Sequence, residues 1–148
     1  MRDLIKIGCV ALVLSLSLAV PVAAGPFEDG LAAYDRGDYA TALRLWRPLA
    51  EQDNATAQFF LGLMYNYGQG VPKDNAEAVT WYRKAAEQGH AAAQSNLGLM
   101  YNLGRGVQKD DAEAVTWYRK AAEQGRAGAQ FNLALMYENA LGVRRDDA

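Results

Sequence analysis

The feature that most constrains this sequence is a long internal repeat. The segment 55–90 is followed at once by a second copy, 91–126, and the two copies are identical at 28 of 36 positions. A further copy begins at Ala127. A period in this range is typical of solenoids, in which each unit buries its apolar face against the next unit.

Each unit contains two predicted helices. The apolar residues of each half recur at helical spacing, first Ala57, Leu61, Met64 and Tyr65 and then Ala78, Trp81, Tyr82 and Ala85. Because a helical spacing fills both halves, the unit is predicted to be a helix pair without strands.

Glycine and aspartate mark the boundaries of these helices. Gly68 and Gly70 end the first helix, since glycine accepts the left-handed conformation of a helix C-cap. Asp74 starts the second helix and is expected to cap its free N–H groups, with Glu77 reaching back to form a capping box. Inside the first helix, Gly62 is expected to let the paired helices approach closely.

The repeated positions resemble those of the Sel-1-like repeat, a relative of the tetratricopeptide repeat. The stretch from Gly30 to Asn54 follows the same logic with a tighter turn and is predicted to be a shorter first repeat. The resemblance rests on Ala57, Leu61, Gly62, Tyr65, Gly68, Gly70, Val71, Asp74, Ala78, Trp81, Tyr82, Ala85, Ala86 and Gly89, and on their counterparts in the next copy.

The resemblance implies an all-α fold, a right-handed α-solenoid of antiparallel helix pairs. We expect three pairs, in repeats of about 26–54, 55–90 and 91–126, followed by a partial repeat over 127–148 with a single C-terminal helix. Members of this family serve as adaptors or scaffolds for protein complexes, in bacteria often in envelope or host-contact roles. A protein-binding scaffold is therefore the expected function.

The first 24 residues have the pattern of a secretory signal peptide. Two basic residues precede an apolar run over 7–20, and small residues follow it. We predict cleavage between Ala24 and Gly25, which leaves a repeat domain of 25–148. The alternative is an uncleaved anchor, but the run is shorter than the ~20 residues that a spanning helix needs. Cleavage predicts an exported protein, periplasmic or extracellular in a bacterium, without a membrane span.

The composition of the exported part excludes some classes of partner. It contains 13 basic and 16 acidic residues, a net charge of −3, and no basic stripe, so nucleic acid is not an expected partner. Cys9, the only cysteine, lies in the signal segment. The domain is therefore expected to depend on apolar burial without disulfides.

Few residues beyond the signal segment could support catalysis or hold a cofactor. That part of the sequence has one serine, Ser95, and one histidine, His90, which is expected to be solvated in the turn between two repeats. The aspartate pair at 110–111 stands at a helix start without calcium-loop spacing, and the Gly-x-Gly pairs follow helices instead of strands. No enzymatic activity, cofactor or metal is expected.

The predicted binding surface is the concave groove of the solenoid, lined by the first helix of each pair. Phe60 is predicted to pack on Trp46 and Leu49 instead, and for Phe59 and Tyr67 packing and binding are weighted equally. The predicted groove residues are Tyr34, Phe59, Leu63, Asn66, Tyr67, Ser95, Leu99, Asn102, Leu103 and Phe131.

The incomplete C-terminal repeat allows other functions. The last helix is expected to act as a lid, or to leave its apolar face for a partner or a second copy, or the sequence is a fragment of a longer gene product. Self-association through the incomplete repeat would make a homodimer with a structural role. A hydrolase directed at the cell wall is the alternative that the residue counts favour least.

Overall fold

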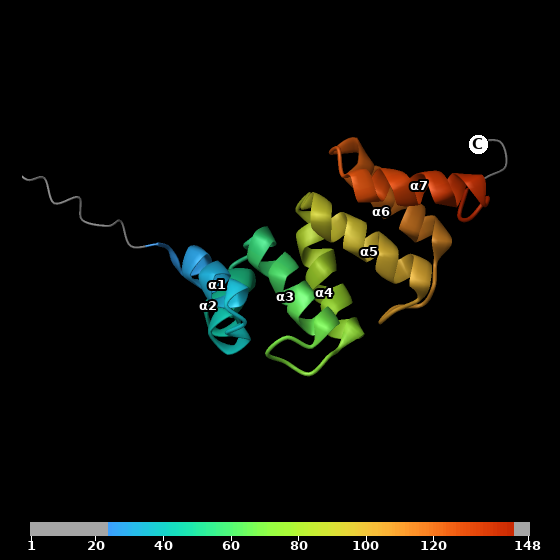
Figure 1. The fold of residues 1–148 in the computed structure, drawn as a ribbon. Helices are drawn as coiled ribbons and strands as arrows, with labels where there is room; N and C mark the ends of the chain where they lie inside the picture. The colour runs from blue at the N-terminus through green and yellow to red at the C-terminus, as the bar shows by residue number, and fades with distance from the viewer. Residues whose placement is uncertain (1–23, 144–148) are drawn as a thin grey trace, which may run out of the picture.

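The computed structural model describes residues 24–143 and contains only helices and their connections over that range (Figure 1). The helices are α1 (Pro26–Asp35), α2 (Tyr39–Glu51), α3 (Ala55–Tyr67), α4 (Asn75–Glu87), α5 (Ala91–Leu103), α6 (Asp111–Glu123) and α7 (Ala127–Glu138). The predicted all-α solenoid of three helix pairs and one further helix is confirmed. The predicted signal segment lies outside the described residues, apart from Ala24.

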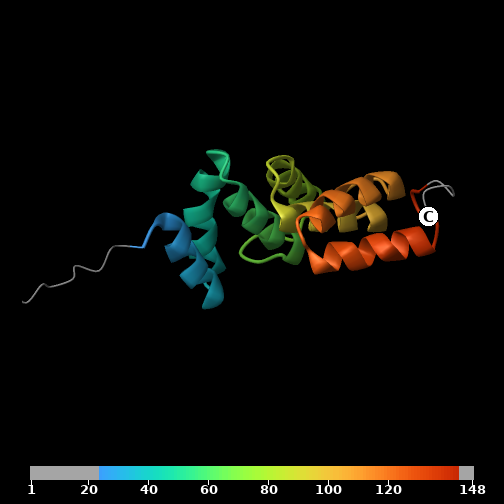
Figure 2. The same ribbon diagram turned by 90° about the horizontal axis from the view of Figure 1, so that it is seen from above.

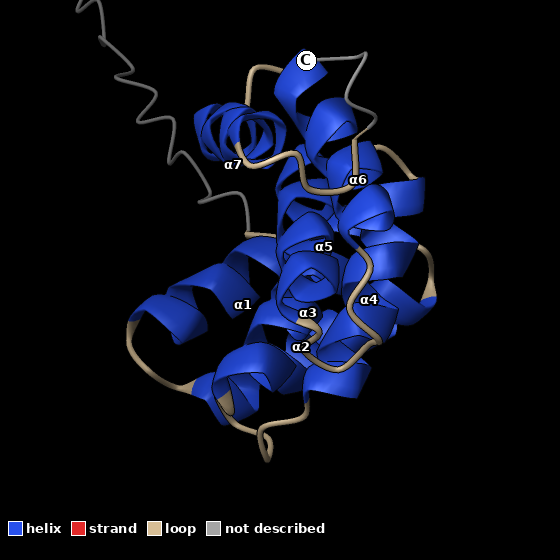
Figure 3. Ribbon diagram, turned by 90° about the vertical axis from the view of Figure 1, so that its right-hand side faces the viewer, coloured by secondary structure: helices blue, strands red, loops and turns tan. Residues whose placement is uncertain are grey.

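The described helices are stacked as a one-dimensional array. The extensive contacts of each helix are with the helix before it and the helix after it. Figure 2 shows the resulting elongated molecule, with α1 and α2 at one end and α7 near the other. Figure 3 places α1 and α7 toward one side and α4 and α6 toward the other, with α3 and α5 between them. Stability in such an array is approximately a sum over neighbouring units. Among residues 24–143, no helix has the length and apolar character needed to cross a membrane.

The helix starts follow the predicted caps only in part. The Asp74 carboxylate accepts hydrogen bonds from the backbone N–H groups of Ala76 and Glu77, at 2.9 and 3.0 Å, as predicted. The predicted return contact of Glu77 is wrong, because its Oε1 accepts a hydrogen bond of 2.9 Å from Trp81 Nε1. A buried indole N–H needs an acceptor, and Glu77 lies one turn before it on the same face.

Close contact between paired helices explains the glycine inside the first helix. A Cβ added to Gly62 would overlap the ring of Tyr82, which is fully buried. In the next pair, a Cβ on Gly98 would lie 2.9 Å from Tyr118 Cδ1. The prediction of a close approach at Gly62 is therefore confirmed, and the tyrosine ring is what occupies the space.

Buried glutamines join one repeat to the next. Gln58 and Gln94 are 0% and 4% exposed, and buried polar groups of this kind need hydrogen-bond partners. Each Nε2 donates to the carbonyl oxygen of an alanine in the preceding helix, Ala50 for Gln58 and Ala86 for Gln94, at 3.0 and 3.1 Å. Gln88 Nε2 also donates to Gln58 Oε1, at 2.7 Å. These bonds fix the register between successive helix pairs.

Candidate functional site

The exposed large apolar side chains of residues 24–143 are concentrated on one kind of helix. None of them lies on α2, α4 or α6. Six of the seven lie on α1, α3, α5 or α7, the first helices of the repeats, and the seventh, Leu141, follows α7. We call the surface made by the six the first-helix face: Leu31, Tyr67, Leu99, Leu103, Phe131 and Leu135.

A leucine recurs on this face, and in each repeat it directly follows a small residue. Gly62 faces the second helix of its pair, and the next residue along a helix is rotated by about 100° toward the outside. Leu63 follows Gly62 and is half-buried, while its counterparts Leu31, Leu99 and Leu135 are exposed. Each repeat therefore contributes one leucine at the same helical position.

The predicted groove residues fall into two groups. Tyr67 and Phe131 are each 65% exposed, and Leu99 and Leu103 are also exposed. The remaining six are half-buried: Tyr34, Phe59, Leu63, Asn66, Ser95 and Asn102.

Tyr34 and Phe59 lie in junctions between repeats. The Tyr34 hydroxyl donates a 2.7 Å hydrogen bond to Gln69 Oε1, and burial raises the pKa of this hydroxyl. The Phe59 ring stacks on His90, with 4.8 Å between ring centroids, and meets Phe60 edge to face at 5.5 Å. Both side chains thus contribute to packing between helix pairs.

Phe60 packs where it was predicted to pack. Its ring centroid lies 4.5 Å from that of Trp46, and it also contacts Phe27 and Tyr34 at 5.9 Å. Leu49 belongs to the same core cluster. This aromatic cluster closes the first repeat and joins it to the second.

A cavity opens between α5 and α7, with α6 behind it. It has a volume of about 220 Å³ and is lined by Leu99, Asn102, Tyr118, Asn132, Leu135, Met136, Asn139 and Leu141. The first two of these residues were predicted. Leu135 is the counterpart of Leu99 one period later, so the repeat itself could have indicated it. No lining residue carries a charge.

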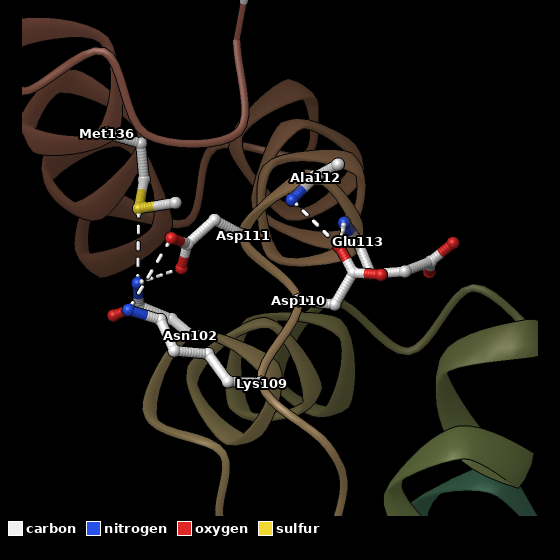
Figure 4. A network of polar contacts seen from close by, with 7 residues as sticks. All are labelled: Asn102, Lys109, Asp110, Asp111, Ala112, Glu113 and Met136. Carbon is white, nitrogen blue, oxygen red and sulfur yellow. Dashed lines mark hydrogen bonds and ion pairs between the residues drawn. The ribbon is translucent and has the colours of Figure 1, made fainter.

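Asn102, which lines this cavity, links α5 to α6 and to α7 (Figure 4). Asn102 Nδ2 donates to Asp111 Oδ1 at 3.1 Å and to Met136 Sδ at 3.4 Å. Asp111 Oδ2 also lies 3.5 Å from Lys109 Nζ. The amide is therefore held in place by its nitrogen, and its oxygen makes no hydrogen bond to residues 24–143.

The chemistry available in the cavity is that of neutral hydrogen bonding. Burial raises the pKa of Tyr118 to about 12, an effect opposed by Asn132, so the hydroxyl is neutral near pH 7. Residues 24–143 contain no group of three or more metal-ligating side chains placed to hold an ion. Hydroxyl, amide and leucine side chains provide a surface for binding.

His90 occupies a structural position that differs from the prediction. It is half-buried, and its Nδ1 accepts a 3.2 Å hydrogen bond from the backbone N–H of Ala93, which caps α5. The expectation of a solvated turn residue is wrong, because the ring both caps the helix and stacks on Phe59. Burial lowers the pKa of His90, and the positive charge of Arg126 lowers it further.

This arrangement predicts a loss of stability at mildly acidic pH. The unfolded chain takes up a proton at the ordinary histidine pKa of about 6.5, whereas folded His90 resists protonation. The contribution of His90 to the free energy of unfolding is therefore complete above about pH 6.5 and is lost as the pH falls through the lowered pKa. Protonation also removes the Nδ1 acceptor, and losing such a cap costs about 1 kcal/mol.

Urea denaturation at several pH values between about 8 and 5 would measure this effect. The control is His90→Asn, because Asn54 caps α3 at the corresponding position without titrating. We expect this variant to keep the cap and to lose the histidine part of the pH dependence. An unchanged pH dependence in His90→Asn would assign the effect to another group.

The comparisons with known proteins identify the repeat. The family model described as Sel1 repeat matches residues 25–54, 55–90, 91–125 and 127–148. No curated protein matches the chain significantly. A Sel1 repeat protein from Oxalobacter formigenes is 40% identical, with a TM-score of 0.77, over 80% of this chain and 49% of that one.

Two further solved structures are similar. A protective antigen present in uropathogenic Escherichia coli strains is 45% identical, with a TM-score of 0.77, over 81% of this chain and 27% of that one. Cysteine-rich protein B of Helicobacter pylori is 22% identical with a TM-score of 0.60, over 72% of this chain and 90% of that one, and it shares the fold. This chain therefore spans about half or less of the first two relatives. With the model matched from residue 25 to residue 148, the chain belongs to the Sel1 repeat family.

Proposed function

We propose that the protein is an exported scaffold that binds another protein on its first-helix face. The observation that carries the proposal is the placement of six of the seven exposed large apolar side chains on α1, α3, α5 and α7. Exposed apolar side chains gathered on one face are typical of interaction sites. Aromatic residues such as Tyr67 and Phe131 are common anchors in protein interfaces, since they bury a large area.

The second helices differ in a way that supports this choice of face. Their large aromatic residues are buried, apart from half-buried Tyr39 at the start of α2, and a lysine covers each of two indole rings. Lys84 Nζ lies 4.6 Å from the ring centroid of Trp81, and Lys120 Nζ lies 4.3 Å from that of Trp117. The charged heads stay in water while the stems cover apolar surface. The second helices thus present a solvated surface, and the first helices present the apolar one.

Two further observations support the proposal. Sel1 repeats form a helical scaffold that is commonly used for protein interaction, because a solenoid offers an extended surface. The segment 1–24 has the pattern of a signal peptide, which supports export. One relative is described as a protective antigen, and an exported location would suit a protein of that kind.

The test is capture of partners by protein recovered from the cell envelope, where we expect the chain to begin at Gly25. Leu99→Asp places a charge on the first-helix face, on α5, and should abolish capture while leaving the helical content unchanged. Thr80→Asp, on an exposed position of α4, is the matched control and should capture normally. Normal capture by Leu99→Asp would place the binding surface elsewhere, and capture of only a second copy of this chain would favour self-association.

A further inference from the structure

We propose that the protein has a second site, which binds a free basic amino acid such as lysine in a cavity lined by charged side chains. The cavity has a volume of about 540 Å³ and is formed by α4, α6 and the connection between α5 and α6. We call it the charged cavity. Its described lining residues include none of the six that make the first-helix face, so the inference does not depend on the proposed function.

The lining of the charged cavity carries both signs of charge. Two basic and three acidic side chains line it, which gives a net charge of −1: Arg83, Lys109, Glu87, Asp110 and Glu113. The volume falls within the roughly 300–1,000 Å³ that is typical of small-molecule sites. A lining of this kind complements a small ligand that carries charges of both signs and a net positive charge.

Two of the carboxylates are available to a ligand. Glu87 and Glu113 form no hydrogen bond or ion pair through their carboxylates with any of residues 24–143. Figure 4 shows the Glu113 carboxylate directed away from Asn102. Asp110, in contrast, already caps α6. Within the described part of the chain, the acidic side chains form no group that could hold a metal ion, so we expect Glu87 and Glu113 to bind two separate ammonium groups.

Arg83 is the expected anchor for a carboxylate of the ligand. Its Nη2 donates a 2.7 Å hydrogen bond to the Tyr101 hydroxyl, and its Cζ lies 5.9 Å from the centroid of the Tyr101 ring. The guanidinium is therefore held in place, and no carboxylate of residues 24–143 pairs with it. A guanidinium has further N–H donors in a planar arrangement that matches the two oxygens of a carboxylate.

A buried indole in the charged cavity lacks an acceptor. Trp117 lines the cavity and is 9% exposed, and its Nε1 has no hydrogen-bond partner among residues 24–143. One period earlier, the equivalent Trp81 Nε1 donates to Glu77 at 2.9 Å. Glu113 is the counterpart of Glu77 but does not accept this bond. Because a buried N–H without a partner is costly, a ligand that brings an acceptor oxygen is favoured here.

A basic amino acid supplies all of these groups in one small molecule. Lysine has one carboxylate for Arg83 and two ammonium groups for Glu87 and Glu113, and its net charge of about +1 near pH 7 is opposite to that of the lining. A neutral amino acid lacks the second ammonium group, and a diamine lacks the carboxylate. The same chemistry therefore distinguishes lysine from its simplest analogues.

The experiment is isothermal titration calorimetry of the purified protein with L-lysine and three analogues. Norleucine lacks the side-chain ammonium group, cadaverine lacks the carboxylate, and Nα-acetyl-lysine lacks the charge of the α-amino group. We expect lysine to bind saturably and each analogue to bind about tenfold or more weakly. Failure of lysine to bind, or equal binding by any of the three analogues, would overturn the inference.

Variants locate the binding. Glu113→Gln and Arg83→Gln should each weaken lysine binding by about tenfold or more. The matched controls are the same changes one period earlier, Glu77→Gln and Arg47→Gln, which should bind lysine normally. Circular dichroism would show that the variants are folded. Normal binding by Glu113→Gln, or an equal loss in Glu77→Gln, would show that lysine does not bind in the charged cavity.

The variant Leu99→Asp separates this inference from the proposed function. It should lose partner capture and still bind lysine normally, because Leu99 does not line the charged cavity. Failure of the capture experiment would thus leave the lysine site standing, and failure of lysine to bind would leave the first-helix face standing. Loss of lysine binding in folded Leu99→Asp would place the lysine on the first-helix face and overturn the second site.

Discussion

Replacing Gly106 by alanine is expected to lower the free energy of unfolding by about 3 kcal/mol. Gly106 has a φ of 68°, a left-handed conformation that costs other residues about 1–2 kcal/mol. A Cβ at this position would also overlap the backbone of Asn75 and Ala76, at the start of α4 in the preceding repeat. Backbone cannot move aside as a flexible side chain can, so this overlap adds a cost of roughly 1–3 kcal/mol. Because the contact joins two repeats, the change should weaken their coupling.

Gly125→Ala is the control for this prediction. Gly125 has a φ of 81°, and no atom beyond its two chain neighbours lies within 4 Å of the position that its Cβ would take. It should therefore lose only the conformational cost of about 1–2 kcal/mol. Urea denaturation followed by circular dichroism would compare the two variants with the unmodified protein. Equal losses would contradict a tight contact between the loop of one repeat and the helix of the previous one.

The helix pairs could be predicted from the sequence because their signals are local. Apolar residues at helical spacing and the glycines near position 68 act within one repeat, and the repetition shows them more than once. The second glycine of each loop is different. Gly70, the counterpart of Gly106 one period earlier, was interpreted as part of a helix stop, yet the strictest requirement at Gly106 is the contact with Asn75. Only the stacked structure reveals which residue of the previous repeat lies there.

The part of the candidate site that could be predicted from the sequence consists of side chains exposed on the surface. Tyr67 and Phe131 are on the surface, as expected for positions that vary between repeats. Asn132, which lines the cavity, was missed because its counterparts one and two periods earlier are Asn96 and Phe60, so the position looked like variation without a pattern. An aromatic side chain suits position 60 because it packs against Trp46, which belongs to the shorter first repeat. The shorter first repeat thus accounts for the phenylalanine at position 60, and this residue obscured the asparagine that the later repeats share at the corresponding position.

A contact with an aromatic ring explains each of the two predictions that were wrong. His90 caps α5 and stacks on Phe59, and Glu77 accepts from the Trp81 indole. The Phe59 ring that stacks on His90 comes from the preceding repeat, whereas the Trp81 indole lies one turn after Glu77 on the same helix. Sequence rules for caps consider only the backbone N–H groups at the helix start and omit nearby rings, so they give the type of residue more reliably than its partner.

Trp46→Ala is expected to cost about 3–5 kcal/mol of unfolding free energy, because it empties the centre of the first repeat. The side chain is fully buried, and its Nε1 donates a 3.1 Å hydrogen bond to the Phe27 carbonyl oxygen. Its ring lies 5.5 Å from that of Tyr34 and 4.5 Å from that of Phe60, and Gly30 provides the space for it. The residual cavity would thus remove contacts from α1, α2 and α3 together.

In an array of neighbour contacts, the damage should be local. Hydrogen exchange of the Trp46→Ala variant should show lost protection in α1 and α2, while α5 and α6 keep theirs. Trp46→Tyr is the matched control, since Tyr82 and Tyr118 fill the corresponding position in the later pairs, and it should retain most of the stability. A loss spread evenly over all helices would show that the chain unfolds as one cooperative unit. A loss below about 1 kcal/mol in Trp46→Ala would contradict the packing of the first repeat.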